Sequence, residues 1–379
     1  MSPLRLAFLG CGDVALRDYL PELPRLAGRA ELVAVCSRTE ARAQAVGQQY
    51  GVPWFTDYRR MLAESSADAV VNLTPIPLHF ETTLACLEAG KHVYCEKPVT
   101  GSVREAEQLL EAAGRQGLTV VCAPSVLLFP QLHRARSLLS EGAIGPITGA
   151  QGHGLGGIPP WGGYLSDPAP FFAAGGGPLK DMGVYPLHAL TGLLGPVRRV
   201  AAFSARTAES FTIADGPFQG REVPIAVPDH WRLLLELEAG LLASIDANNC
   251  VAGTRAPELE IFGRQGTIAL NLLDVSAPID CLRAGRGWEA ISLPRTGRDR
   301  GPDHLLGVEH LVECVQTGSQ PIASLPHALH VVEVIEKAEQ SAAEGRAVSV
   351  ESWFENPDVS RQASVARRQS RRQTPDAGR

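Results

Sequence analysis

The sequence predicts an α/β protein with two folded units: a doubly wound parallel sheet over residues 1–124, then an α+β unit with a large, mostly antiparallel open sheet over residues 125–355. One observation predicts the first unit. Short, fully apolar runs alternate with helical patterns, and such runs are typical of parallel strands that helices cover on both faces. A second observation predicts the second unit: from about residue 197 onwards, strand patterns follow one another with turn signals between them.

Apolar runs mark the strands of the first unit, and amphipathic segments mark its helices. The strands are expected at 4–9, 31–36, 69–73, 92–95 and 118–122, and the helices at 39–50, 80–89 and 102–116. The helix that starts near Asp13 should break after about two turns, because Pro21 and Pro24 interrupt it. A short second helical turn is expected before the second strand.

The second unit opens with a predicted helix near 130–141 and a strand near 147–153. A loop rich in glycine and proline follows over 152–178, and loops of this length in compact domains are commonly functional. The spacing of the later segments predicts an antiparallel meander. Its strands are expected at 197–206, 229–238, 241–249, 257–263 and 266–271, with closing helices near 304–317 and 325–342.

The composition excludes several classes of protein. No apolar run reaches the roughly 18 residues of a bilayer span, so no membrane partner is expected. A net charge of −6 argues against a nucleic-acid partner. The eight cysteines form no Cys-x-x-Cys pair, which predicts reduced thiols in a cytoplasmic protein without a metal site. Residues 356–379 are rich in arginine and predict a disordered basic tail, with a basic docking arm as the alternative.

A glycine-rich turn follows the first strand, as Gly10-x-Gly12-x-x-Ala15. The glycines allow a tight turn and close approach of the backbone, and the helix that follows offers free N–H groups to a pyrophosphate. We therefore predict a dinucleotide-binding Rossmann domain, with contacts from Gly10, Gly12, Asp13 and Val14. An ordinary tight turn is the alternative interpretation.

The end of the second strand would read the ribose of that dinucleotide. A site for NAD would offer Asp or Glu there, whereas this chain has Ser37 and Arg38. Arginine can pair with a 2′-phosphate. The sequence therefore favours NADP, with NAD as the alternative if Arg38 is only a surface charge.

Glu96-Lys97-Pro98 follows the fourth predicted strand. Open α/β sheets bind their ligands at the carboxyl ends of the strands, where this motif lies. A lysine held there can donate to a substrate hydroxyl and can lower the pKa of a neighbouring phenol or imidazole. A surface Glu–Lys pair at a turn is the alternative.

A second polar segment lies beyond the triple glycine at 175–177. Asp181, Tyr185 and His188 are spaced so that they share one face if the segment is a single helix. Tyr185 needs its pKa of about 10 lowered to exchange protons near neutrality, which Lys97 could do, and His188 is a competing acid–base candidate. The alternatives are that Asp181 caps a helix, that Tyr185 is a core aromatic and that His188 is structural.

These motifs together resemble the Gfo/Idh/MocA family, which includes glucose–fructose oxidoreductase and inositol dehydrogenase. The resemblance spans nearly the whole chain except the tail, and it rests on Gly10-Cys11-Gly12, Thr74-Pro75 with His79, Ala89-Gly90-Lys91-His92-Val93, Glu96-Lys97-Pro98 and the glycine-rich segment before Asp181. It implies that Lys97 is catalytic and that Thr74, Pro75, His79 and Glu96 line the nicotinamide half of the cofactor site. Tyr185 stands where histidine is commoner, as in the Tyr-type branch of the family.

The resemblance implies a nicotinamide-dependent oxidoreductase that transfers hydride to or from a hydroxyl or carbonyl carbon of a sugar, cyclitol or related polyol. Lys97 and Tyr185 would form the proton relay, and Asp181 would orient the substrate. The alternatives are a glycoside-cleaving enzyme that keeps NAD bound and a non-catalytic ligand-sensing regulator. Residues 123–130 are apolar, which predicts an apolar pocket floor. Family members pair through the open sheet face, so a homodimer or homotetramer is expected.

Overall fold

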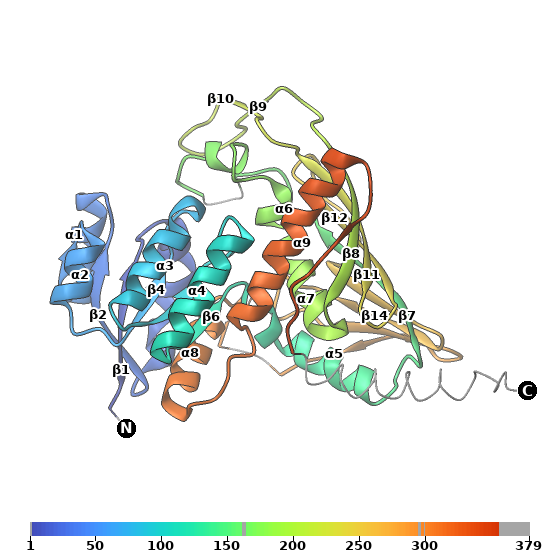
Figure 1. Ribbon diagram of the computed structural model, residues 1–379, viewed down its shortest axis with the longest axis horizontal. Helices are drawn as coiled ribbons and strands as arrows, with labels where there is room; N and C mark the ends of the chain where they lie inside the picture. The colour runs from blue at the N-terminus through green and yellow to red at the C-terminus, as the bar shows by residue number, and fades with distance from the viewer. Residues whose placement is uncertain (1, 161–163, 295–296, 299, 356–379) are drawn as a thin grey trace, which may run out of the picture.

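The computed structural model describes residues 2–160, 164–294, 297–298 and 300–355. Two sheets lie on either side of a central pair of helices, α4 (Val103–Gln116) and α9 (Leu325–Glu344), which pack against each other (Figure 1). The predicted tail at 356–379 lies outside the described residues. No helix of the described part of the chain is long and apolar enough to cross a membrane.

The first sheet is parallel throughout, as predicted, with the strand order β3-β2-β1-β4-β5-β6. Its strands are β1 (Leu4–Leu9), β2 (Ala30–Cys36), β3 (Trp54–Phe55), β4 (Ala69–Asn72), β5 (His92–Cys95) and β6 (Val120–Cys122). Strand β3 and helix α2 (Tyr58–Glu64) were not predicted, because two and seven residues are too short to show a period. The strand order reverses between β1 and β4, and this switch point is where such sheets bind ligands.

The helices of this unit are α1 (Glu40–Tyr50), α3 (His79–Glu88) and α4, close to the predicted ranges. The predicted break in the first helix is confirmed. A five-residue π-helical turn, η1 (Ala15–Tyr19), is followed by a 3-10 segment, η2 (Leu20–Leu26). Pro21 and Pro24 lack the N–H that a regular helix needs, which accounts for the change of winding.

The second sheet has nine strands in the order β16-β15-β14-β13-β7-β12-β11-β8-β17. They are β7 (Ile147–Gly154), β8 (Val197–Ala205), β11 (His230–Leu237), β12 (Leu242–Asn248), β13 (Leu259–Gly263), β14 (Gly266–Leu270), β15 (Ile279–Arg283), β16 (Gly287–Ile291) and β17 (Val348–Ser349). A separate hairpin pairs β9 (Ser210–Thr212) with β10 (Glu222–Pro224).

The predicted meander is wrong at one point. Strand β7 inserts between β13 and β12 and runs parallel to β12. A Cβ on Gly149 would lie 2.8 Å from the carbonyl oxygen of Leu242, so the glycine allows the two backbones to approach. Strands β15, β16 and β17 were not predicted, and they extend the sheet at its two edges.

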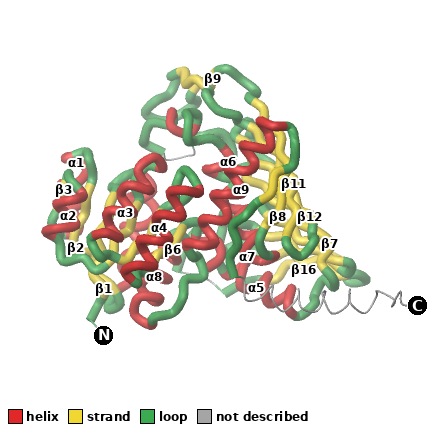
Figure 2. The backbone as a smooth tube through the Cα atoms, in the orientation of Figure 1, coloured by secondary structure: helices red, strands yellow, loops and turns green. Residues whose placement is uncertain are grey.

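One face of the second sheet packs against helices, and the other faces solvent (Figure 2). The covering helices are α5 (Pro130–Ser140), α7 (Val184–Leu194) and α9. Sequence analysis also expected α8 (Leu305–Thr317) to close this unit. In the structure α8 instead packs in the core of the parallel sheet, with Val308 and Leu311 beside Leu6 and Phe8. Helix α9 contributes to the cores of both sheets, and thereby joins them.

Candidate active site

The glycine-rich turn lies at the carboxyl end of β1, next to the loop after β4. Gly10 has φ +109°, and a Cβ there would lie 2.5 Å from the carbonyl oxygen of Leu73. Only glycine fits, because both the conformation and the space exclude a side chain. Gly12 faces open space, with nothing within 4 Å of a Cβ position. The bare backbone at Gly12 fits the close approach of a pyrophosphate.

Asp13 holds a loop of the second unit against this turn. Its Oδ2 accepts hydrogen bonds from the backbone N–H groups of Leu165 (2.9 Å) and Ser166 (2.6 Å). Its carboxylate is therefore engaged within the protein, and the backbone is what Asp13 can offer a cofactor. Val14, which precedes η1, is partly buried against the core of the first sheet.

Ser37 and Arg38 follow β2 and lie at the same edge of the sheet. The backbone N–H of Ser37 donates to Phe55 at 3.0 Å, while the side chain of Arg38 is exposed and makes no ion pair with another described residue. Arg42 is a further cation that sequence analysis did not single out. Burial raises the pKa of the Cys11 thiol to about 11, and the charge of Arg42 opposes that rise. Its position in the first turn of α1 (Glu40–Tyr50), just after β2, was the available signal.

Hydrogen bonds connect the residues that follow β4 with those that follow β5, and together these residues form one rim of the site. The ring nitrogens of His79 lie 2.6 Å from the carbonyl oxygen of Pro98 and 2.7 Å from that of Thr74. The hydroxyl of Thr74 donates to Asn72 at 2.8 Å. Pro75 adopts an extended conformation before the short segment η3 (Ile76–Leu78). The predicted nicotinamide-site residues therefore come together at one edge of the sheet.

Lys97 and Asp181 form a buried contact between the two units. The Nζ of Lys97 donates to Asp181 Oδ1 at 2.6 Å and to the carbonyl oxygen of Asp181 at 2.8 Å. The two side chains are 13% and 8% exposed. Burial alone would lower the pKa of Lys97, but the nearby Asp181, Tyr185 and Glu96 raise it well above its usual value. Lys97 therefore remains a cation.

Tyr185 lies beside this pair. Its ring centroid is 5.3 Å from the Nζ of Lys97, so the ammonium faces the ring rather than bonding to the hydroxyl. Burial raises the pKa of Tyr185 to about 12, and the positive charge of Lys97 opposes that rise. The structure thus brings Lys97, Asp181 and Tyr185 together, as the sequence predicted.

Asp181, Tyr185 and His188 do not belong to a single helix, so the condition under which all three would share one face is not met. Asp181 ends α6 (Pro178–Asp181), and Tyr185 lies in the first turn of α7. Gly183 lies between the two helices, and a Cβ there would lie 2.8 Å from the carbonyl oxygen of Leu179. There is therefore no room for a side chain at the point where α6 has ended and α7 begins.

His188 lies in the core between α7 and α9, with its ring centroid 4.8 Å from that of His327. Burial lowers the pKa of His188 to about 3, which favours the neutral ring. Residues 126 and 127, which belong to the stretch 123–130 predicted to make an apolar pocket floor, are almost fully buried core residues. At 5%, the exposed fraction of His188 is close to the 7% of Tyr185.

One carboxylate oxygen of Asp181 has no hydrogen-bond partner among the described residues. This oxygen, Oδ2, is buried. Buried polar atoms in proteins are nearly always paired, so an unpaired carboxylate oxygen in a site marks the position of a ligand or water. A hydroxyl donor would satisfy it.

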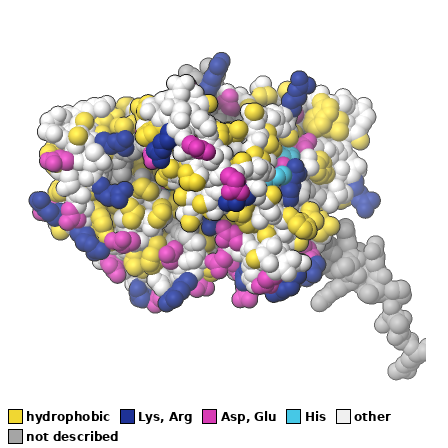
Figure 3. Space-filling model, turned by 90° about the horizontal axis from the view of Figure 1, so that it is seen from above, with side chains coloured by type: hydrophobic (Ala, Val, Ile, Leu, Met, Phe, Trp, Pro, Cys, Tyr) yellow, Lys and Arg dark blue, Asp and Glu magenta, His cyan; other side chains and the backbone are white. Residues whose placement is uncertain are grey.

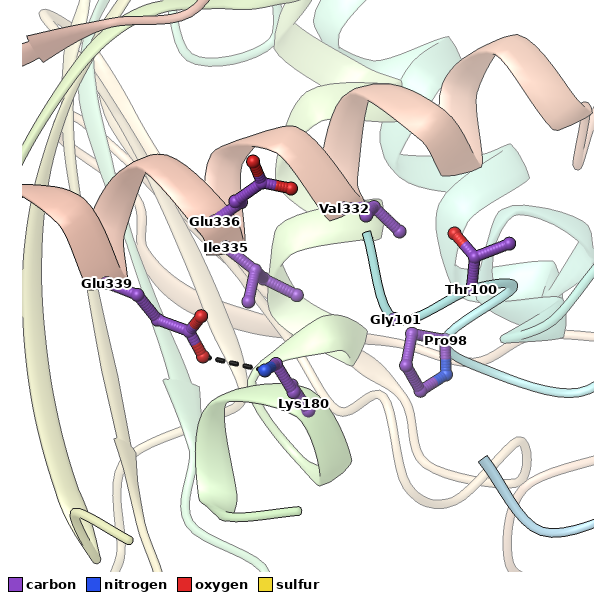
Figure 4. Close-up of a pocket in the computed structure, with 8 residues that line it drawn as sticks. All are labelled: Pro98, Thr100, Gly101, Lys180, Val332, Ile335, Glu336 and Glu339. Atoms are coloured by element: carbon purple, nitrogen blue, oxygen red, sulfur yellow. Dashed lines mark ion pairs between the residues drawn. The ribbon is translucent and has the colours of Figure 1, made fainter. Parts of the chain in front are cut away.

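Lys180, which precedes Asp181 in the chain, makes an ion pair within the second unit. Figure 4 shows Lys180 of α6 reaching Glu339 of α9, with Nζ and Oε1 2.7 Å apart. The pocket between α6, α9 and the loop that begins at Pro98 encloses about 10 Å³, roughly the space of one water. It is a packed junction rather than a ligand site. No group of His, Cys, Asp or Glu that could hold a metal ion occurs among the described residues.

Comparisons with known proteins agree with this geometry. Residues 4–123 match a family described as an oxidoreductase family with an NAD-binding Rossmann fold, and residues 132–269 match the GFO/IDH/MocA C-terminal domain. The aldose–aldose oxidoreductase from Caulobacter crescentus has a similar structure, with a TM-score of 0.76 at 25% identity over 92% of this chain and 99% of that one.

Two curated relatives are enzymes of sugar metabolism by name. A dTDP-3,4-didehydro-2,6-dideoxy-alpha-D-glucose 3-reductase from Streptomyces violaceoruber is 34% identical, over 52% of this chain and 56% of that enzyme. A D-apiose dehydrogenase from Paraburkholderia graminis is 26% identical, over 95% of this chain and 93% of that enzyme. The match with the reductase thus spans little more than half of its length. The two matched segments occur in the same order as the two units of the fold. The chain therefore belongs to the Gfo/Idh/MocA family of oxidoreductases.

Proposed function

We propose that this protein is a nicotinamide-dependent oxidoreductase that acts on a CH–OH group of a sugar, cyclitol or related small polyol. The observation that carries the proposal is the buried Lys97–Asp181 pair, with Asp181 Oδ2 unpaired and Tyr185 alongside. Lys97 lies at the same edge of the parallel sheet as the glycine-rich turn, and relatives of the chain are sugar oxidoreductases by name. A bound nicotinamide would supply or accept the hydride.

Three side chains would orient the substrate, stabilise the phenolate and exchange the proton. Asp181 Oδ2 accepts a hydrogen bond from a substrate hydroxyl and orients it. Lys97 holds Asp181 in place and provides the positive charge that makes the phenolate of Tyr185 less costly. Tyr185 exchanges the proton of the reacting hydroxyl. Because Lys97 is already an ion-paired cation with a raised pKa, its part in the relay is electrostatic.

Residues 1–124 would supply the cofactor half of the site and residues 125–355 the substrate half. Backbone groups of Gly10, Gly12, Asp13 and Val14 would contact the pyrophosphate. The rim of Thr74, Pro75, His79 and Glu96 would contact the nicotinamide. Ser37 and the unpaired cation of Arg38 favour NADP, since a 2′-phosphate would give Arg38 its partner.

Fluorescence titration with NADPH and NADH tests this proposal. The wild type should bind NADPH more tightly, and Arg38→Ala should weaken NADPH binding by about tenfold or more, the loss of one charge-assisted contact. NADH binding should change little, which makes it the internal control. Equal effects on both cofactors would contradict the assignment of NADP.

The same protein, mixed with cofactor and a panel of sugars, separates the proposal from its alternatives. Net change of the nicotinamide absorbance with one sugar supports an oxidoreductase. Cofactor retained through purification, with bond cleavage but no net reduction, would indicate a glycoside-cleaving enzyme. Binding of sugar and cofactor without any turnover would indicate a sensor.

We also propose that the open face of the second sheet pairs with a second copy of the chain. Phe203, Leu234 and Leu242 point outwards there and are 81%, 66% and 67% exposed. On the same face Arg232 forms an ion pair with Asp246 at 2.8 Å, so these two charges compensate each other within one copy of the chain. Exposed apolar patches of this kind mark association surfaces.

Leu234→Glu is expected to convert the dimer, or a tetramer built from it, to smaller species, because it places a charge in the apolar part of the contact. Light scattering after gel filtration measures the mass. Glu289→Gln on the exposed edge strand β16 is the control and should leave the mass unchanged. A wild type that is monomeric at tens of micromolar would contradict this proposal.

A further inference from the structure

Glu96 is a carboxylate held by neutral donors. Its Oε1 accepts from the hydroxyl of Tyr19 at 2.5 Å, and its Oε2 accepts from the backbone N–H of Lys97 at 2.9 Å. Within the described part of the chain, no lysine, arginine or histidine lies at ion-pair distance from Glu96. The neighbouring ammonium of Lys97 is turned towards Asp181. Glu96 thus carries a charge that the protein does not pair.

Tyr19 reaches Glu96 from an unusual helical turn. It is the last residue of the π-helical turn η1, it is 0% exposed, and such turns occur preferentially at functional sites. Burial, followed by the nearby Glu96, raises the pKa of Tyr19 well above 10. Its hydroxyl therefore stays protonated and remains a donor to the carboxylate.

A short chain of hydrogen-bonded hydroxyl groups, separate from the contact with Glu96, holds the hydroxyl of Tyr19 in place. Its hydroxyl lies 2.9 Å from that of Tyr94, which lies 3.2 Å from the hydroxyl of Ser125. Ser125 in turn donates to the carbonyl oxygen of His304 at 3.2 Å. Because the chain ends on a backbone carbonyl, it leads no proton out of the site. Its effect is to position Tyr19 and, through Tyr19, Glu96.

Space for this chain is provided by α8. A Cβ on Gly307 would lie 2.3 Å from the ring of Tyr94 and 2.6 Å from the hydroxyl oxygen of Ser125. Only a residue without a side chain allows the helix to pass there. The buried hydroxyls under Glu96 therefore depend on a helix about 200 residues further along the chain.

We propose that Glu96, held in place by Tyr19, is a fixed anion that makes the cofactor site bind the oxidised nicotinamide in preference to the reduced one. This inference rests on the proposed function. The oxidised ring carries a positive charge and the reduced ring is neutral, so an unpaired carboxylate at the rim favours the first. The two side chains set the preference for oxidation state, whichever of NAD and NADP binds.

Glu96→Gln tests the charge with little change of shape. The dissociation constants of the oxidised and reduced cofactor are measured separately on the wild type and the variant, by calorimetry and by nicotinamide fluorescence. Binding of the oxidised form should weaken on the order of tenfold, from a single charge lost in a partly buried site. Binding of the reduced form should stay within about twofold. The melting temperature shows whether the variant is folded.

Tyr19→Phe tests the positioning part. Without its donor the carboxylate can turn away, so the preference for the oxidised form should fall by about threefold, less than in Glu96→Gln. Tyr94→Phe is the graded comparison: it removes a hydroxyl that holds Tyr19 but leaves the Tyr19–Glu96 bond, so it should lower the preference by less than Tyr19→Phe does.

Each possible result of these measurements tests a different part of the proposal. Equal weakening of both cofactor forms by Glu96→Gln would overturn the inference, because Glu96 would then only shape the site. A preference unchanged in Tyr19→Phe but lost in Glu96→Gln would overturn the role of Tyr19. A wild type that binds neither cofactor form would overturn the proposed function itself.

Discussion

Lys97→Met is expected to lower kcat by about 10²–10⁴-fold while the protein still binds the reduced cofactor, a loss typical for removal of a group that supports acid–base catalysis. The substitution keeps the unbranched shape of the side chain, one heavy atom shorter, and removes its charge. Asp181 then loses its two contacts with the ammonium, and the phenolate of Tyr185 loses the cation that opposes the effect of burial on its pKa. Steady-state kinetics and a cofactor titration measure the two effects.

Lys97→Met should also destabilise the fold, because it leaves Asp181 buried without a counter-ion. Breaking one partner of a buried ion pair costs about 3–5 kcal/mol. Lys180→Met is the matched control, since Lys180 precedes Asp181 in the chain but pairs with the half-exposed Glu339. It should lose no more than about 1 kcal/mol and keep its turnover. Turnover close to the wild type in Lys97→Met would refute the catalytic assignment.

Substrate oxidation is expected to accelerate about tenfold for each pH unit between roughly pH 6 and 9, until Tyr185 titrates in the loaded site. With a pKa raised to about 12, Tyr185 is almost entirely protonated in that range, and each unit increases the phenolate fraction tenfold. Carbonyl reduction uses the protonated phenol, so its rate should change little over the same range. A plot of log kcat against pH in both directions measures this asymmetry.

Tyr185→Phe should lower kcat by about 10²–10⁴-fold and remove the slope with pH. Tyr164→Phe is the informative comparison. Burial raises the pKa of Tyr164 too, the charges of Asp13 and Asp181 add to that rise, and the charges of Arg17 and Lys97 oppose it. If the slope is lost in Tyr164→Phe and kept in Tyr185→Phe, Tyr164 is the base and the assignment of Tyr185 is wrong.

Charged side chains of both signs share one face of the molecule. Lysine and arginine are interspersed with aspartate and glutamate there (Figure 3).

The sequence alone determined the features that depend on local periodicity. Apolar runs separated by helical patterns predict a parallel sheet, and the positions of Gly10, Ser37, Thr74 and Lys97 just after its strands place them at one edge. This follows because the carboxyl ends of parallel strands meet there. The break after the first helix was also predictable, since proline acts through its own backbone.

The tertiary structure alone decided which polar groups share the site. His188 lies three residues after Tyr185 on α7, yet its ring packs against His327 of α9, a residue about 140 positions further along the chain. The insertion of β7 beside β12 likewise depends on contacts about 90 residues apart. Tyr19 reaches Glu96 only because a π-helical turn and a helix after residue 300 leave room beneath it. Local sequence patterns contain no information about such distant packing, and it is packing that selects the partners of a buried group.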